Sequence, residues 1–423
     1  MVNKNSILNI IILTTYLLVS LLAIYPTMQQ YVCILILFII GYLSYKDKLY
    51  KIAPLFIFFN SSILYYEGIA IVDIYFFFYI LEKLFRKSTI KKKSMHNMFI
   101  IFILYTVLVV FFNNSMLSLE IMLSLIFLLL FLNDILNRRV WHEFCYSYII
   151  TMLFAILYGV FNQYFMQNTD ENIRFLMAFT DPNYAGMFLS IGLYITIFKK
   201  DIFSTIFRFF IIVICLIAIF ATVSSTALLC NIIILLILLL DVLSSYEGIY
   251  ILLTKYLIVF TVIVCILFYL QSLHIPLIDR TFERFIDKIN MFSSGSIENA
   301  TTGRSDVWKE HLNYFWNQNN IFHFLFGGNY LTDRGFDISK FSIVSHQVYI
   351  DSLLTFGIVG TIMYVISIIK QLFIKFIRRT ENCDTKIIFI ISLIWLIYSF
   401  GLSMFPFWGF IFFLYVNIES KEE

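Results

Sequence analysis

Residues 274–345 form a long polar segment in which Arg304 is the side chain best placed for chemistry. If this part is helical, positions i, i+4, i+8 and i+11 share one face. That face carries Arg304, Trp308, Leu312 and Phe315. Arginine thus heads an apolar stripe, and its planar guanidinium suits two-point binding of a phosphate or a carboxylate. The alternative is a structural ion pair with Asp306 or Asp351.

His346 stands at the end of this segment, where the next apolar segment begins. A neutral imidazole can accept a proton from a hydroxyl group, and the protonated ring can bind phosphate. The alternative is an interfacial histidine that only makes hydrogen bonds. Arg304 and His346 are therefore the candidate catalytic residues.

Two other patterns are typical of phosphate binding but have ordinary explanations. Residues 279–290 have an apolar face and a basic row of Arg280, Arg284 and Lys288, so this helix would either lie against lipid phosphates or simply pack on the membrane spans. Asp181-Pro182-Asn183 opens an apolar segment. Asp as the N-cap and Pro at the first position are common helix-start signals, although a helix start also attracts anions.

The composition excludes a soluble fold. The chain has 423 residues, of which 61% are hydrophobic and 13% are charged, and its mean hydropathy is +0.87. Soluble domains contain roughly 25% charged residues. The net charge of +3 does not indicate a nucleic-acid partner, and the six cysteines form neither a disulfide framework nor a metal-binding spacing. We therefore expect no metal and no cofactor.

The distribution of apolar segments predicts an all-α polytopic membrane protein with about 12–14 transmembrane helices. The expected spans are 7–25, 30–45, 51–66, 68–85, 97–113, 117–134, 144–165, 182–198, 205–222, 225–243, 253–273, 346–369, 387–403 and 405–418. The chain then divides into N-terminal spans over 1–273, a large loop over 274–345 and C-terminal spans over 346–423.

Lysine and arginine predict the orientation of these spans. Basic clusters at 46–51, 86–93, 138–139, 199–208 and 370–386 all fall on one side if the N-terminus is cytoplasmic. Both termini are then cytoplasmic, and the segment 274–345 is external.

Several short motifs resemble the O-antigen polymerase and O-antigen ligase superfamily in their order and spacing over about 180–360. They are Thr180-Asp181-Pro182-Asn183-Tyr184-Ala185, Gly303-Arg304-Ser305-Asp306-Val307-Trp308, Phe326-Gly327-Gly328-Asn329, His346-Gln347-Val348-Tyr349-Ile350 and Gly357-Ile358-Val359-Gly360. The N-terminal half resembles the family only in its hydrophobic pattern.

This resemblance implies a membrane-embedded glycosyltransferase of the type C class in a bacterial inner membrane, with an external or periplasmic active site. Its substrate would be an oligosaccharide on undecaprenyl pyrophosphate, and a chain-length regulator protein would be a further partner. Arg304 would bind the pyrophosphate, and His346 would be the general base or a second phosphate contact. The matched motifs also imply substrate-binding roles for Asp181, Asn183, Trp308 and Tyr349.

One departure concerns the phosphate ligands. The family usually has an arginine near Ser225, but this chain reads Ser224-Ser225-Thr226-Ala227. Another cation would have to take its place, and Arg174, Arg280 and Arg284 are the candidates.

Compared with the family that the chain resembles, the loop is short and divergent, and the chain is rich in Phe and Ile. Both features favour a polymerase of repeat units in O-antigen or capsule synthesis over a ligase that transfers glycan to lipid A-core. A flippase or transporter is the alternative from another class. Transporters usually show matching halves and midplane binding residues, whereas the polar residues here collect in one loop.

Overall fold

A computed structural model describes most of the chain. The described residues are 4–59, 63–67, 69–86, 104–106, 116–162, 174–179, 181–244, 304–317, 320–327, 345, 347–402 and 408–418, with single residues between 269 and 293. Arg280, Arg284 and His346 lie outside them, as does the Arg304 side chain.

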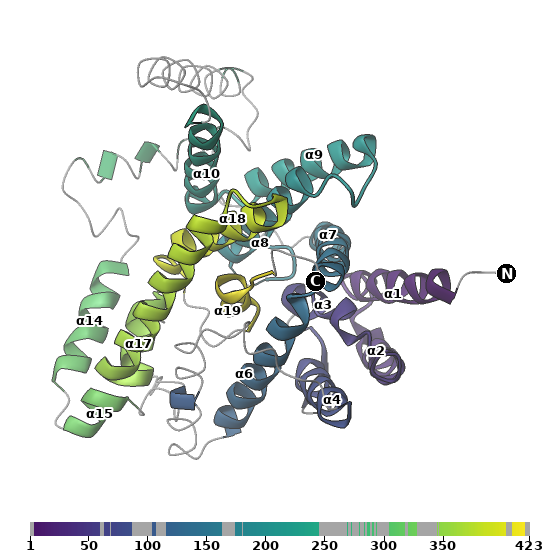
Figure 1. Ribbon diagram of the computed structural model, residues 1–423, viewed down its shortest axis with the longest axis horizontal. Helices are drawn as coiled ribbons and strands as arrows, with labels where there is room; N and C mark the ends of the chain where they lie inside the picture. Colours follow the sequence, from purple (N-terminus) through teal and green to yellow (C-terminus); the bar gives the residue numbers. More distant parts are fainter. Residues whose placement is uncertain are drawn as a thin grey trace.

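The described part is mostly helical (Figure 1). The longer helices are α1 (Lys4–Leu21), α2 (Gln29–Tyr45), α4 (Ile71–Phe85), α6 (Met116–Ile135), α7 (Arg138–Phe161), α8 (Pro182–Phe198), α9 (Thr205–Ala221), α10 (Ser225–Ser244), α17 (Val348–Arg378), α18 (Cys383–Ser399) and α19 (Trp408–Tyr415). Two helices come from the polar segment, α14 (Arg304–Trp316) and α15 (Ile321–Phe326), and they lie beside the first part of α17 (Figure 1).

Most expected spans coincide with helices, but the span at 51–66 is wrong. The chain there forms the 3-10 turn η2 (Leu49–Ile52), the four-residue helix α3 (Leu55–Phe58) and a small antiparallel hairpin of β1 (Tyr65–Tyr66) and β2 (Ile69–Ala70). Pro54 cannot donate a backbone hydrogen bond, so it is tolerated at a helix start but not inside a helix. The spans at 97–113 and 253–273 lie largely outside the described residues.

The chain is an all-α membrane protein. Within the described residues, three helices are long and apolar enough to cross a membrane: the η1–α2 stretch Pro26–Tyr45, which begins with the 3-10 turn η1 (Pro26–Met28), α7 and α17. Several shorter helices, among them α8 and α9, are also apolar. Large side chains such as Phe38, Ile217 and Phe373 are 74%, 60% and 62% exposed. Exposed apolar surface of this kind is typical of helices that face lipid.

Aromatic rings fill the centre of the bundle. Phe58 of α3 has its ring 5.0 Å from that of Tyr148 in α7 and 5.9 Å from that of Phe188 in α8. Phe413 of α19 lies 5.8 Å from Tyr148 and 6.0 Å from Phe188. Tilted and edge-to-face pairs at these distances are favourable, and they join four elements that are far apart in sequence.

The bundle has two ends with different chemistry. One end, called the motif end, contains the starts of α8, α10 and α17 and the end of α18, with Asp181, Asn183, Trp308 and Tyr349. The other, called the charged end, contains the ion pairs Lys51–Glu143, Lys83–Asp47, Lys83–Asp134 and Lys199–Asp384.

Helix α7 connects the two ends. It contributes Glu143 near its start, whereas Gly159 near its end lies against Phe175 and Met177, which precede α8. The 24 residues of this helix span about 36 Å at 1.5 Å per residue. The two ends are therefore on opposite faces of the bundle.

Candidate functional site

Helix α14 is bound to the start of α17. Trp308 Nε1 donates a hydrogen bond to the carbonyl oxygen of Ser345, 2.7 Å away. Phe315 is fully buried and packs with Ile350 and Leu354 of α17. The apolar part of the predicted face, Trp308, Leu312 and Phe315, is thus confirmed, and its partner is α17.

The residues on both sides of His346 are held in place. The Ser345 hydroxyl donates to Asp351 and accepts a 3.1 Å hydrogen bond from the backbone N–H of Gln347. Gln347 is the N-cap of α17, so the helix begins two residues after His346, which itself lies outside the described residues.

The carboxylates considered as structural partners of Arg304 already have other contacts. Asp306 is 3.3 Å from Lys309 Nζ in an exposed ion pair, and Asp351 is 2% exposed and accepts from Ser345. Arg304 is the first residue of α14, and it lies one helical turn before Trp308.

Two glycines from separate motifs meet where α15 touches α17. Gly327 ends α15 with φ +74°, and Gly357 interrupts α17 with φ +64°. A Cβ on Gly327 would lie 2.2 Å from the Thr355 carbonyl oxygen, and a Cβ on Gly357 would lie 2.5 Å from that of Leu325. Only glycine fits either position, because both the left-handed backbone and the close approach exclude a side chain. We call this contact the glycine junction.

Tyr105 secures the glycine junction. Its hydroxyl is 2.7 Å from the Phe356 carbonyl oxygen and 3.0 Å from that of Phe326, so it can donate to either. Its ring occupies the space beside Gly360, where a Cβ would come within 2.4 Å of it. Sequence reasoning missed this residue, because nothing distinguishes Tyr105 from the other 26 tyrosines, although the Gly357-x-x-Gly360 spacing does indicate a close contact.

The Asp181-Pro182-Asn183 motif begins α8 as its sequence predicts. The Asp181 carboxylate accepts a 2.7 Å hydrogen bond from the backbone N–H of Asn183, and Pro182 is the first helical residue. Asn183 Oδ1 also accepts a 2.6 Å hydrogen bond from the Ser224 hydroxyl. The helix-start interpretation is therefore confirmed, and Asn183 also joins α8 to the start of α10.

Arg174 lies close to the position at which the family arginine is missing. Its Nε donates a 3.0 Å hydrogen bond to the carbonyl oxygen of Thr222. Thr222 is three residues before Ser225. Of the candidate replacements, Arg174 is the one that the structure describes, since Arg280 and Arg284 are outside the described residues.

The end of α18 connects the starts of α17 and α8. The hydroxyls of Tyr349 and Ser399 are 3.0 Å apart. The neighbouring Tyr398 hydroxyl would lie 3.0 Å from a Cβ on Gly186, four residues into α8. The structure thus brings Tyr349 into the same end of the bundle as Asp181 and Asn183.

His311 of α14 is a buried histidine that sequence reasoning did not select. It is fully buried, and Nδ1 lies 2.7 Å from the Val307 carbonyl oxygen. Burial lowers the pKa of His311 below its usual value, and the Val307 carbonyl only partly opposes this. Burial therefore favours the neutral imidazole in the folded protein.

Among the residues that the structure describes, no group of three or more His, Cys, Asp or Glu side chains is arranged to hold a metal ion. Comparison of the chain with protein-family models, curated proteins and solved structures found no match. The fold and the site define the class, an all-α membrane protein with a polar assembly at one end.

Proposed function

We propose that this protein is a membrane-embedded glycosyltransferase that polymerises lipid-linked oligosaccharide repeat units on the external side of the membrane. One contact carries the proposal: the hydrogen bond from Trp308 to the carbonyl oxygen of Ser345. Arg304 is one turn before Trp308, and His346 directly follows Ser345. The contact therefore supports a single site that contains both candidate catalytic residues.

The other motif residues support the same site. Asp181 and Asn183 at the start of α8, together with Arg174 beside Thr222, belong to the end of the bundle that contains Tyr349. In this proposal Arg304 and Arg174 bind the pyrophosphate of the donor and stabilise the negative charge that develops as it leaves.

The proposed reaction is one displacement at a sugar carbon. The hydroxyl oxygen of the acceptor sugar forms a bond to the anomeric carbon of the donor glycan, and the bond from that carbon to the pyrophosphate oxygen breaks. His346 accepts the hydroxyl proton, and the lipid pyrophosphate leaves with its electron pair. Because two arginines neutralise the leaving group, the proposal does not require a metal.

The test uses a strain that lacks the gene and is complemented with variants. Arg304→Ala should collapse the surface-glycan ladder to a single repeat unit, and Arg304→Lys should be nearly as poor because lysine lacks the two-point fork. The matched control is Arg208→Ala, which removes an arginine near the start of α9 at the charged end. All variants should accumulate to similar levels in the membrane.

Other outcomes would contradict the proposal. Full-length glycan that remains on its lipid carrier in the deletion strain would indicate a ligase. Repeat units that stay on the cytoplasmic side would indicate a flippase. Purified protein that needs magnesium after EDTA treatment to make polymer would contradict the metal-free reaction.

A further inference from the structure

The geometry points to a second binding site, at the charged end: a cavity between α1, η2 and α7 that takes the phosphate group of an anionic phospholipid. This inference does not depend on the proposed function, because it concerns the opposite face of the bundle and is tested by binding alone.

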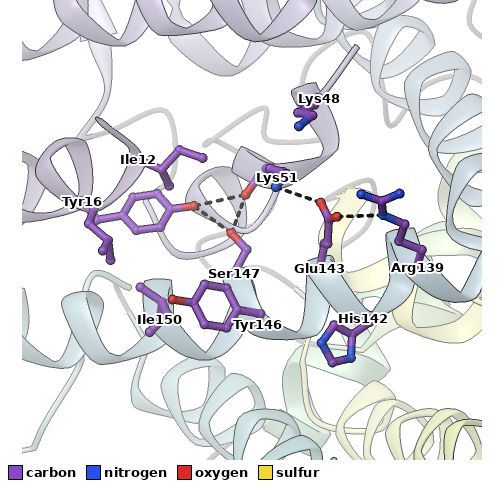
Figure 2. A pocket seen from close by; sticks show the side chains of 11 residues that line it. Ile12, Tyr16, Lys48, Lys51, Arg139, His142, Glu143, Tyr146, Ser147 and Ile150 are labelled. Carbon is purple, nitrogen blue, oxygen red and sulfur yellow. Dashed lines mark hydrogen bonds and ion pairs between the residues drawn. The ribbon is translucent and has the colours of Figure 1, made fainter. Parts of the chain in front are cut away.

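The cavity has a volume of about 380 Å³, within the range of roughly 300–1,000 Å³ that is usual for small-molecule sites. Figure 2 shows that α1 forms one wall and the first turns of α7 form the opposite wall. Lys48, the residue before η2, and Lys51 within η2 also line the cavity. The cavity therefore lies where α1 and α7 separate near the charged end.

The lining has an excess of positive charge. Among the described residues that line the cavity, Lys48, Lys51 and Arg139 are the cations and Glu143 is the one carboxylate. The Nε of Arg139 donates a 3.4 Å hydrogen bond to the Glu143 carboxylate, and the Arg139 side chain is 78% exposed. In Figure 2 the dashed line to Glu143 starts at Nε of Arg139 and not at its terminal nitrogens. A basic pocket between membrane helices on the cytoplasmic side suits a lipid headgroup.

Glu143 organises the basic side chains rather than cancelling them. Its carboxylate is 2.9 Å from Lys51 Nζ and accepts a 2.7 Å hydrogen bond from the Tyr50 hydroxyl. One carboxylate thus holds a lysine and an arginine on the same side of the cavity. Such a preorganised pair loses less side-chain entropy when an anion binds.

The floor of the cavity is lined by polar groups that already make hydrogen bonds with one another. The hydroxyls of Tyr16 and Ser147 are 2.9 Å apart, and both lie against the carbonyl oxygen of Lys51. These groups fix the depth of the cavity, and they leave the basic rim as the place for a charged ligand.

Part of the remaining wall is apolar, which favours a lipid over free phosphate. Ile12 and Leu13 of α1 and Ile150 of α7 line the cavity beside its basic rim. An inorganic phosphate would leave these methyl groups without a partner, whereas the glycerol and first acyl carbons of a phospholipid would cover them. The ligand is therefore an anion with an apolar part.

The test measures lipid binding to the purified full-length protein by native mass spectrometry during titration with phosphatidylglycerol. Wild-type protein should retain one tightly bound lipid. Arg139→Gln should weaken that binding about tenfold, because each basic residue near a lipid phosphate contributes appreciably to binding. Leu13→Trp should weaken it similarly by filling the cavity without a change of charge. Arg208→Gln, an equal loss of charge at the same end but outside the lining, should have no effect.

Four results would overturn the inference. They are unchanged binding in both cavity variants, an equal loss in Arg208→Gln, equal binding of zwitterionic phosphatidylcholine, and displacement of the lipid by inorganic phosphate at similar concentration. The last would make free phosphate the ligand. Because Arg139 is largely exposed, its replacement should leave the fold intact, which circular dichroism checks.

Discussion

The two ends of the bundle are held together by different forces. At the charged end, ion pairs join separate helices, as in Lys199–Asp384 at 2.6 Å. At the motif end, separate elements are joined by hydrogen bonds such as that from Trp308 to Ser345 and by the close backbone approach of the glycine junction. The charged end should therefore be sensitive to changes of charge, and the motif end should be sensitive to added volume.

The largest expected effect is from Gly327→Ala. The new Cβ would overlap the Thr355 carbonyl, and φ +74° is unfavourable for alanine. Backbone strain and overpacking together should cost roughly 2–5 kcal/mol. Thermal unfolding in detergent should show the loss, and polymer should be absent. Gly41→Ala is the matched control: a Cβ there meets nothing within 4 Å, so stability should be unchanged or slightly higher. Equal stability of both variants would disprove the glycine junction.

Next comes Lys199→Met at the charged end. The side chains of Lys199 and Asp384 are 8% and 15% exposed, so removal of the cation leaves a mostly buried carboxylate and should cost about 3 kcal/mol. The double variant, Lys199→Met with Asp384→Asn, should recover part of the lost stability. Lys309→Met breaks an exposed pair at the motif end and should cost well under about 1 kcal/mol. If the two single variants lose the same stability, the contrast between the ends fails.

Tyr105→Phe should have a smaller effect. It removes the hydroxyl that contacts the carbonyls of Phe326 and Phe356, at a cost of about 1–2 kcal/mol. Hydrogen exchange should become faster in α15 and at the start of α17 but not in α18. Tyr31→Phe, at a tyrosine that is 72% exposed, is the control and should change nothing.

The smallest expected effect is a pH dependence at the motif end. Since burial lowers the pKa of His311, the histidine binds a proton at higher pH when α14 is unfolded and exposed than when the helix is folded and His311 is buried. The contribution of the buried neutral histidine to the stability of α14 is therefore fully present above pH 6.5, the usual value for histidine, and is lost as pH falls through the lower pKa of the folded state. Hydrogen exchange in α14, corrected for intrinsic rates, should be faster at about pH 5.5 than at about pH 7.5. In His311→Leu the difference should disappear, and its persistence would assign the effect to another group.

Much of the fold follows from hydrophobicity and helix-start signals. The expected spans 182–198 and 205–222 match α8 and α9 almost residue for residue, because Asp181-Pro182 and Ser204 provide strong helix starts next to long apolar runs. The prediction of a span at 51–66 was wrong, because hydrophobicity alone does not distinguish a membrane helix from a buried segment that is broken into short elements.

The candidate site could be predicted only in part. The face of Trp308, Leu312 and Phe315 follows from helical periodicity, and its burial is confirmed. The partner of that face, and the meeting of Gly327 with Gly357, could not be predicted, because such contacts join residues far apart in sequence. The cavity at the charged end was missed for the same reason: its basic residues were interpreted only as markers of orientation.

The break in α17 also has a consequence for membrane depth. Gly357 lies ten residues beyond the N-cap Gln347, about 15 Å along a helix axis, or half of a hydrocarbon layer about 30 Å thick. Irregular backbone is tolerated at that depth only where protein covers it, and Tyr105 and α15 provide the cover. The side chains of Ile321 and Phe322 in α15 are 74% and 56% exposed, and we expect them to face lipid. We therefore expect this part of the polar segment to lie at the membrane, close to the lipid that carries the proposed substrate.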